Sequence, residues 1–508
     1  MLLGDLGGPK ALGLNSPQSS VLDAANIGSE EDHRTDIELF LQENECQSGF
    51  FLPDATGRFP VGVTTFATPV RPARPIGSVK LKSKNDSKNA LYLEEVAFTV
   101  YYPTTVEGSC RKGVPWLLRP VQETLRGFAI FLNFPSWLLW PIVYFFGALL
   151  KIPAYPNTPL LNPTKAKEYF SDDKATPPSQ WPLVIFSHGL GGTRTAYSQF
   201  CTRLAASGKV VIALEHRDGT APETDILWDD NEAPESHPIP LRGEQLAFRH
   251  HEIHIAYSTI CRLLQNDSTL ELDVIDQASF DKKSWIAKDE SGQAIIRYDD
   301  RVILTGHSFG GCTVLSLLST APLNGHPAIP VERAIILDPW LEPLPSPGPV
   351  PSSLNTTGEI VKLEESVSSS FQAAGGSYPD VNHEKTSSQH PSVLVINSET
   401  FTLWKDHYAR LQEVVAGWEP QGGHILTIVG SVHISFSDFP VLPVVRRKFA
   451  LHIMDVISQL SLSFLENKLE ETLHTISTTK MEIEIIGVRK DGKPKRKLIG
   501  KPGDVVVQ

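Results

Sequence analysis

Short runs of residues that are apolar at both odd and even positions recur along the chain, with longer mixed segments between them. These runs lie at residues 184–187, 210–214, 302–305, 334–337, 393–396 and 425–429. Strands that are apolar on both faces are typical of a parallel sheet covered by helices on both sides, so the pattern predicts a mainly parallel α/β fold. Residues 91–102 predict a hairpin or an edge strand, and residues 242–264 predict a long helix.

The same pattern divides the chain into three parts. Residues 1–55 show little periodicity and are expected to form a flexible extension. Residues 56–465 hold all the strand runs and predict one α/β domain, with a Pro-, Ser-, Gly- and Glu-rich insertion at residues 343–391. Residues 466–508 are expected to form a flexible C-terminal extension. Its basic run at residues 489–501 is typical of a solvated tail, with a membrane tether and a nuclear-localisation signal as alternatives.

The composition is that of a globular protein. The chain has 508 residues, of which 41% are hydrophobic and 20% charged, enough for one large core. A net charge of −12 argues against general nucleic-acid binding. The five cysteines are scattered without metal spacing, and the first residues lack a basic and apolar leader pattern. We therefore expect reduced thiols, no secretory signal and an intracellular, cytoplasmic location, with peripheral membrane association as an option.

One uncharged segment, residues 128–150, is long enough to span a membrane. Pro135 and Pro141 interrupt its helical pattern, and it falls inside the α/β domain, so an interfacial flap is favoured. A buried core segment and a true span are the alternatives. The aromatic residues expected to face lipid are Trp137, Trp140, Tyr144 and Phe145.

The strand run at residues 302–305 leads directly into Gly306-His307-Ser308-Phe309-Gly310. This G-x-S-x-G pattern places a serine on a tight strand-to-helix turn, where side chains at the two glycines would collide with neighbouring strands. The next residues, 311–318, are small and apolar, as in a helix that packs on a sheet with its N-terminus towards an oxyanion. Ser308 is therefore predicted to be a nucleophile.

A serine nucleophile needs a histidine base and a carboxylate at later strand ends. Asp338 directly follows the fourth apolar run and is the favoured acid, and His433 follows the sixth run after a three-residue loop and is the candidate base. Asp438 is the competing acid. Asp299 and Asp300 precede their strand, so they are expected at the opposite edge of the sheet.

Attack on a carbonyl also requires N–H donors for the oxyanion. A glycine-rich loop, residues 187–192, follows the first strand run, and glycines let backbone N–H groups approach a substrate closely. The N–H groups of Leu190 and Phe309 are the predicted donors.

Other histidines are alternative candidates for metal ligands or bases. His250, His251 and His254 lie in the predicted long helix with spacing that resembles a metal pair, but the H-E-x-x-H pattern is absent. His188 and His307 are more typical of packing or hydrogen-bonding residues than of bases. The sequence therefore predicts no metal and no organic cofactor.

Six motifs, in the same order along the chain, are similar to those of the plasma and type II intracellular platelet-activating factor acetylhydrolases. They lie at residues 187–191, 215–218, 306–311, 337–338, 396–399 and 430–433. The resemblance extends over most of the chain and implies an α/β-hydrolase fold. The insertion at residues 343–391 departs from the family, where this connection is shorter.

The resemblance implies a calcium-independent serine esterase that removes short or oxidised acyl chains from the sn-2 position of glycerophospholipids. It implies Ser308 as nucleophile, Asp338 as acid and His433 as base, with oxyanion N–H groups at Leu190 and Phe309. Phospholipid, presented on a membrane or lipid-aggregate surface, is the expected partner. A general carboxylesterase or acyltransferase and a non-catalytic, membrane-associated interaction protein on a hydrolase scaffold stay open as alternatives.

Overall fold

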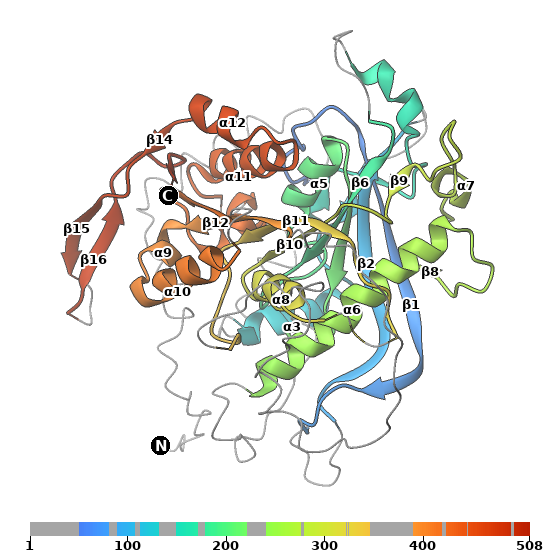
Figure 1. Cartoon of the computed structure of the whole chain (residues 1–508), viewed down its shortest axis with the longest axis horizontal. Coiled ribbons are helices and arrows are strands. Elements are labelled where there is room, and N and C mark those ends of the chain that lie inside the picture. Colours follow the sequence, from blue (N-terminus) through green and yellow to red (C-terminus); the bar gives the residue numbers. More distant parts are fainter. Residues whose placement is uncertain are drawn as a thin grey trace, which may run out of the picture.

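The computed structural model describes residues 50–80, 89–106, 112–131, 149–170, 178–220, 240–275, 279–321, 323, 325–345, 390–418, 423–443, 446–488 and 492–507 (Figure 1). Nearly all of the predicted N-terminal extension, most of the apolar segment and most of the insertion lie outside these residues. Trp137, Trp140, Tyr144 and Phe145 do so as well, and their contact with lipid stays a prediction. Within the described ranges, no helix is both long enough and apolar enough to cross a membrane.

The six strands predicted from the apolar runs are all present and lie side by side in one sheet. They are β6 (Trp181–Ser187), β7 (Val210–Glu215), β10 (Val302–His307), β11 (Val331–Leu337), β12 (Ser392–Ser398) and β13 (Gly423–Ile428). Their spatial order is β7-β6-β10-β11-β12-β13, and every neighbouring pair is parallel. The predicted α/β fold with a mainly parallel sheet is confirmed.

An antiparallel hairpin continues this sheet beyond β7. β1 (Val61–Pro75) pairs with β2 (Tyr92–Pro103), and β2 pairs with β7 on its other side. The prediction of a hairpin for residues 91–102 is confirmed, but that of an edge strand is wrong, because β2 lies inside the sheet. The spatial order is β1-β2-β7-β6-β10-β11-β12-β13. It differs from the order along the chain because β7 lies between β2 and β6, and this is the strand order of the α/β-hydrolase fold.

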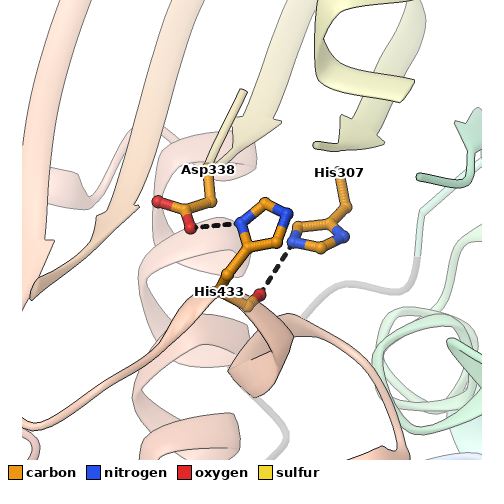
Figure 2. A group of neighbouring side chains, drawn as sticks. All are labelled: His307, Asp338 and His433. Atoms are coloured by element: carbon orange, nitrogen blue, oxygen red, sulfur yellow. Dashed lines mark hydrogen bonds and ion pairs between the residues drawn. The ribbon is translucent and has the colours of Figure 1, made fainter. Parts of the chain in front are cut away.

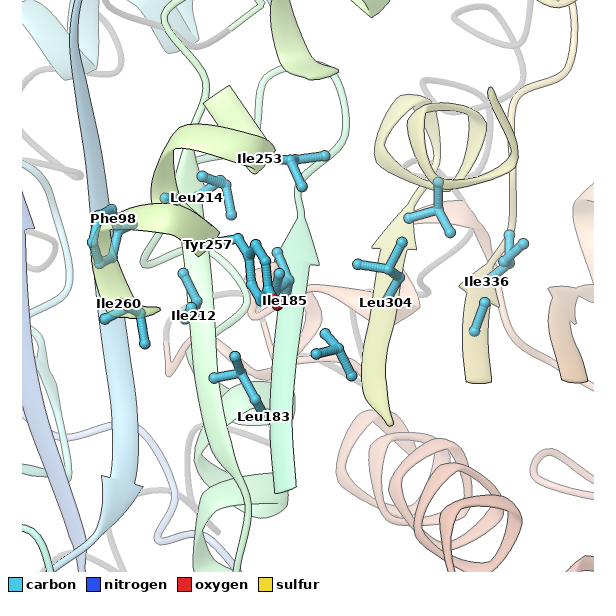
Figure 3. Close-up of a cluster of buried hydrophobic side chains, with 14 of the residues drawn as sticks. Phe98, Leu183, Ile185, Ile212, Leu214, Ile253, Tyr257, Ile260, Leu304 and Ile336 are labelled. Atoms are coloured by element: carbon cyan, nitrogen blue, oxygen red, sulfur yellow. The ribbon is translucent and has the colours of Figure 1, made fainter. Parts of the chain in front are cut away.

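Helices cover both faces of the sheet, as the doubly apolar strands predict. They are α6 (Pro240–Leu264) and α8 (Phe309–Leu318) on one face, and α5 (Ser198–Ala206) and α11 (Ala450–Leu465) on the other. Leu183 and Ile185 of β6 point into the first core, which Figure 3 shows between the sheet and α6. Val184 and Phe186 belong to the second core. Successive residues of one strand therefore enter opposite cores.

Shorter elements fill the connections. The helices are α3 (Val121–Phe131), α7 (Lys282–Trp285), α9 (Glu399–Thr402), α10 (Lys405–Ala416) and α12 (Leu469–Thr475), with 3-10 turns η1 (Pro163–Tyr169), η4 (His433–Phe436) and η5 (Phe439–Val441). The short strands are β3 (Val114–Pro115), β4 (Lys151–Ile152), β5 (Tyr155–Pro156), β8 (Asp273–Val274), β9 (Ile296–Arg297) and β14 (Thr478–Thr479). Of these, α9 and η4 matter for the site, because they follow β12 and β13 at the carboxyl edge of the sheet.

The C-terminal part differs from the expected flexible extension. β17 (Val505–Val507) pairs antiparallel with β13, so it belongs to the central sheet, and Val505 and Val506 are buried. Residues 494–498 of the basic run form β16 (Pro494–Leu498), which pairs with β15 (Ile483–Val488) in a hairpin that stands beside the sheet (Figure 1). The prediction was wrong because three valines are too short a run to identify a strand, and their burial depends on the distant strand β13.

Candidate active site

Ser308 lies on a strained turn between β10 and α8. Its backbone has φ 57° and ψ −118°, a conformation that residues with side chains rarely adopt. Close packing explains the flanking glycines. A Cβ at Gly306 would lie 2.3 Å from the Gly310 carbonyl oxygen, and a Cβ at Gly310 would lie 2.0 Å from the Ser187 carbonyl oxygen. Small residues are therefore required at both positions.

The structure brings Ser308, His433 and Asp338 together at the carboxyl edge of the sheet. The Nε2 atom of His433 lies 2.8 Å from Ser308 Oγ. Its Nδ1 atom lies 2.7 Å from Asp338 Oδ2 (Figure 2). Asp338 is fully buried directly after β11, whereas the side chain of His433 is 15% exposed. The three side chains form a hydrogen-bonded chain that solvent can reach at the histidine.

Asp338 is held by the residue that ends β12. Ser398 donates its backbone N–H to Oδ1 at 2.6 Å and its hydroxyl to Oδ2 at 2.7 Å. Because a carboxylate oxygen only accepts, the hydrogen between Oδ2 and His433 belongs to Nδ1. This arrangement leaves Nε2 of the imidazole as acceptor for the Ser308 hydroxyl, the tautomer that a general base requires.

Two aromatic rings fix the imidazole of His433. Phe401 of α9 stacks on it, with ring centroids 4.3 Å apart and planes inclined by 4°. The ring of His307 lies 4.6 Å away, and its Nε2 donates to the His433 carbonyl oxygen at 2.9 Å (Figure 2). The other nitrogen of His307 accepts from the Tyr197 hydroxyl at 2.8 Å. Burial lowers the pKa of His307 well below its ordinary value, so this ring stays neutral and serves as a packing and hydrogen-bonding residue.

Glu399 anchors the loop that carries His433. Its carboxylate accepts the Gly430 N–H at 2.6 Å and the Leu498 N–H at 3.0 Å. Its own N–H donates to Ser431 Oγ at 3.2 Å. Burial raises the pKa of Glu399, and the two N–H donors oppose that rise. The histidine loop and strand β16 therefore share one buried carboxylate.

Sequence reasoning assigned no chemistry to Ser398, Glu399 or Phe401. Their position could have been noticed, because they end or directly follow β12. That strand lies between β11, which precedes Asp338, and β13, which precedes His433. Side chains at the end of a parallel strand share an edge with those of its neighbours, so these residues can reach both loops.

The glycine-rich loop after β6 lies against the nucleophile candidate. A Cβ at Gly189 would lie 2.8 Å from Ser308 Cβ. Among the residues that the structure describes, no acceptor takes the N–H of Leu190 or Phe309. Both predicted oxyanion donors therefore lie in segments that adjoin Ser308, and neither is used by the fold.

A buried polar network supports this loop from behind. Arg249 donates to the His188 carbonyl oxygen at 2.6 Å and pairs with Asp218 at 2.7 Å. His188 donates from Nδ1 to the Gly189 carbonyl oxygen and accepts the His216 N–H at Nε2. Burial and the neighbouring guanidinium of Arg249 lower the pKa of His188 to about 3. His188 is therefore a neutral hydrogen-bonding residue.

Ser187, His216 and Glu252 form a second set with the same order of groups. His216 Nε2 lies 2.8 Å from Ser187 Oγ, and its Nδ1 lies 2.6 Å from Glu252 Oε2. All three residues are at most 1% exposed. Burial raises the pKa of Glu252 and lowers that of His216, so both disfavour charge. A substrate cannot reach this set, which makes the Ser308 set the accessible one.

Asp438, the competing acid in the sequence, caps a helix instead. Its Oδ1 accepts the Gln199 N–H at 2.9 Å, and its Oδ2 accepts the Ser198 N–H at 3.0 Å. The Ser198 hydroxyl and the Trp116 indole N–H also donate to Oδ2. These backbone donors belong to the first turn of α5, whose N–H groups have no partner within the helix.

The cluster of His307, Asp338 and His433 also has to be considered as a metal site. In the described part of the chain it is the one group whose three potential ligand atoms lie within 4.8 Å of one another. The nitrogens of both imidazoles and both carboxylate oxygens already take part in the hydrogen bonds given above. Every potential ligand atom of this cluster is therefore already engaged within the protein.

Fold and site together define a class, an α/β-hydrolase with serine, histidine and aspartate arranged as in serine hydrolases. A family model described as "Platelet-activating factor acetylhydrolase, isoform II" matches residues 45–348 and 376–480. The chain belongs to that family, and the resemblance drawn from the six motifs is confirmed. The unmatched residues between the two parts fall within the insertion at residues 343–391.

Individual relatives agree with the family match. The chain is 31% identical over 264 residues to the platelet-activating factor acetylhydrolase of Canis lupus familiaris (48% of this chain, 50% of that protein). It is 25% identical over 406 residues to that of Gallus gallus (74% and 78%). A "Putative phospholipase A2" of Schizosaccharomyces pombe is 31% identical over 184 residues (32% and 41%). The alignments with the Canis and Bos taurus proteins span about half the length of those relatives.

Among solved structures, a ferulic acid esterase from Streptomyces cinnamoneus superposes on the chain with a TM-score of 0.47 and 14% sequence identity. The superposition covers 84% of this chain and 94% of the esterase.

Replacing Asp438 should alter the pH dependence of stability. Burial raises the pKa of Asp438 to about 6, compared with about 3.9 for an unfolded chain, so the folded state binds this proton more tightly. Its contribution to stability is then fullest below about pH 4 and is lost as the pH rises through about 6. We expect the unfolding free energy of the wild type, relative to Asp438→Asn, to fall between about pH 4 and pH 7 in urea titrations. A difference in unfolding free energy between the two proteins that does not change with pH would contradict the raised pKa of Asp438.

Proposed function

We propose that this chain is a serine hydrolase that cleaves a carboxylic ester of glycerophospholipids. The observation that carries the proposal is the hydrogen-bonded chain of Ser308, His433 and Asp338, in a member of the platelet-activating factor acetylhydrolase family. The finer assignment follows the family resemblance. It is removal of an acetyl group, or of a short or oxidised acyl chain, from the sn-2 position of lipids similar to platelet-activating factor.

In the first half of the proposed reaction, His433 Nε2 takes the Ser308 proton while Oγ attacks the ester carbonyl. Asp338 keeps Nδ1 as donor and stabilises the imidazolium that forms. The oxyanion would accept hydrogen bonds from the N–H groups of Leu190 and Phe309. Phe309 is the first residue of α8, at the positive end of the helix dipole. The imidazolium then gives its proton to the leaving alkoxide, which releases lysophospholipid and leaves the acyl group on Ser308.

In the second half, water attacks the acyl-serine ester and His433 Nε2 takes a proton from it. The same proton returns to Ser308 Oγ as the acyl-oxygen bond breaks. One water is consumed, and one carboxylic acid and one lysophospholipid are produced. Each proton transfer uses the Nε2 atom that lies 2.8 Å from Ser308 Oγ.

Ser308→Ala should lower hydrolysis of a phospholipid with a short sn-2 chain by about 10³-fold or more, because the attacking oxygen is lost. Turnover of this lipid and of a matched long-chain lipid would be measured with chelator present. Ser291→Ala, a serine control on an exposed turn, should keep the turnover of the wild type.

The outcomes of this measurement separate the alternatives. Selective, chelator-resistant turnover of the short-chain lipid supports the finer assignment. Turnover of a small chromogenic ester without phospholipid hydrolysis would favour a general carboxylesterase or acyltransferase. A folded wild type that hydrolyses no ester at all would contradict the proposal and favour a non-catalytic, membrane-associated role.

Glu399→Gln should lower kcat and leave KM nearly unchanged. A glutamine offers one acceptor oxygen in place of two, so the N–H of Gly430 or of Leu498 loses its partner. A small displacement of His433 should then lower kcat by about tenfold or more. Glu290→Gln, on an exposed turn, is the control. A kcat equal to that of the wild type would show that Glu399 does not position the histidine.

A further inference from the structure

The hairpin of β15 and β16 is a two-stranded sheet separate from the central one, and it projects from the side of the molecule (Figure 1). All six residues of β15 are exposed. A two-stranded hairpin is only marginally stable in water, and an exposed apolar strand is usually covered by a partner. The hairpin therefore has the properties of an interaction element.

Aliphatic side chains dominate the exposed strand. The exposed fractions are 44% for Ile483, 69% for Ile485, 48% for Ile486 and 72% for Val488. Single exposed aliphatic residues are ordinary on protein surfaces, but a contiguous group marks a binding surface. Contact with water is unfavourable for all four, so a partner with an apolar region would stabilise the hairpin.

Cations lie on β16, the other strand of the hairpin. In the register, Arg496 pairs with Ile485, Lys495 with Gly487 and Lys497 with Glu484. Residues 480–501 contain eight basic and three acidic residues, whereas the whole chain carries a net charge of −12. Aliphatic side chains next to a local positive charge fit a surface with an apolar interior and anionic headgroups.

The base of the hairpin is fixed beside the candidate active site. Leu498, at the end of β16, is fully buried against Val429 and donates its N–H to Glu399. The same carboxylate accepts the N–H of Gly430, three residues before His433. A surface that holds the hairpin is therefore connected through one carboxylate to the edge of the sheet where Ser308 lies.

We propose that the β15–β16 hairpin docks this protein on an anionic phospholipid surface. Ile485 and Val488, the most exposed of the aliphatic residues, enter the apolar boundary of the lipid layer, while Lys495 and Arg496 contact its headgroups. The inference goes beyond the proposed function, because docking requires no ester chemistry. It is also independent of residues 132–148, which lie outside the described residues.

The test uses the full chain with Ser308→Ala, so that lipid is bound but not consumed. Flotation with phosphatidylcholine vesicles, with and without phosphatidylserine, measures binding. We expect binding that requires phosphatidylserine and weakens with added salt. Ile485→Ser with Val488→Ser, and separately Lys495→Gln with Arg496→Gln, should each reduce the apparent affinity by about tenfold or more.

Lys165→Gln with Lys167→Gln, which removes two exposed lysines from η1, is the matched charge control and should bind as the parent does. Thermal unfolding of each variant checks the fold without reference to activity, so failure of docking can be told apart from failure of the proposed function. Equal binding by all variants, or no binding of the parent to anionic vesicles, would overturn the proposal. A parent dimer that Ile485→Ser with Val488→Ser converts to monomer would overturn it too, because a second copy would then cover the hairpin.

Discussion

The close approach of Gly310 to β6 is the constraint on which the arrangement of the site depends. A Cβ at this glycine would lie 2.0 Å from the Ser187 carbonyl oxygen, so α8 begins directly against the strand that leads into the glycine-rich loop. The backbone pairing of β10 with β6 and β11 leaves the turn little room, and Ser308 takes a positive φ. Backbone packing therefore sets both the position of Ser308 and its distance from the loop at Gly189.

A second level of organisation comes from the residues that end β12 and form α9. Ser398 binds the carboxylate of Asp338, Glu399 binds the loop at Gly430, and Phe401 stacks on the imidazole of His433. Three residues within four consecutive positions therefore contact the acid, the histidine loop and the ring. Such contacts reduce the freedom of the imidazole before any substrate binds, which is the physical meaning of preorganisation.

The sequence was sufficient for features that depend on local pattern. Doubly apolar runs located the six parallel strands, and G-x-S-x-G located the turn at Ser308 because steric collision at its glycines is a local property. It was insufficient where one partner lies far away in the chain. The pairing of β17 with β13 and the bond from Leu498 to Glu399 join segments that local pattern does not connect. Asp438 was left as a rival because spacing alone does not show that its oxygens face the N-terminus of α5.

Burial separates two sets of serine, histidine and carboxylate that have nearly the same hydrogen-bond distances. In the Ser187 set, proton transfer to His216 would create an imidazolium without contact with solvent, and burial lowers the pKa of that imidazole. In the Ser308 set the imidazole reaches solvent, and its acid partner accepts two further hydrogen bonds from Ser398. A charged histidine is therefore far less costly beside Ser308. The buried set lies instead at the base of the glycine-rich loop, where fixed hydrogen bonds keep the backbone beside Ser308 in place.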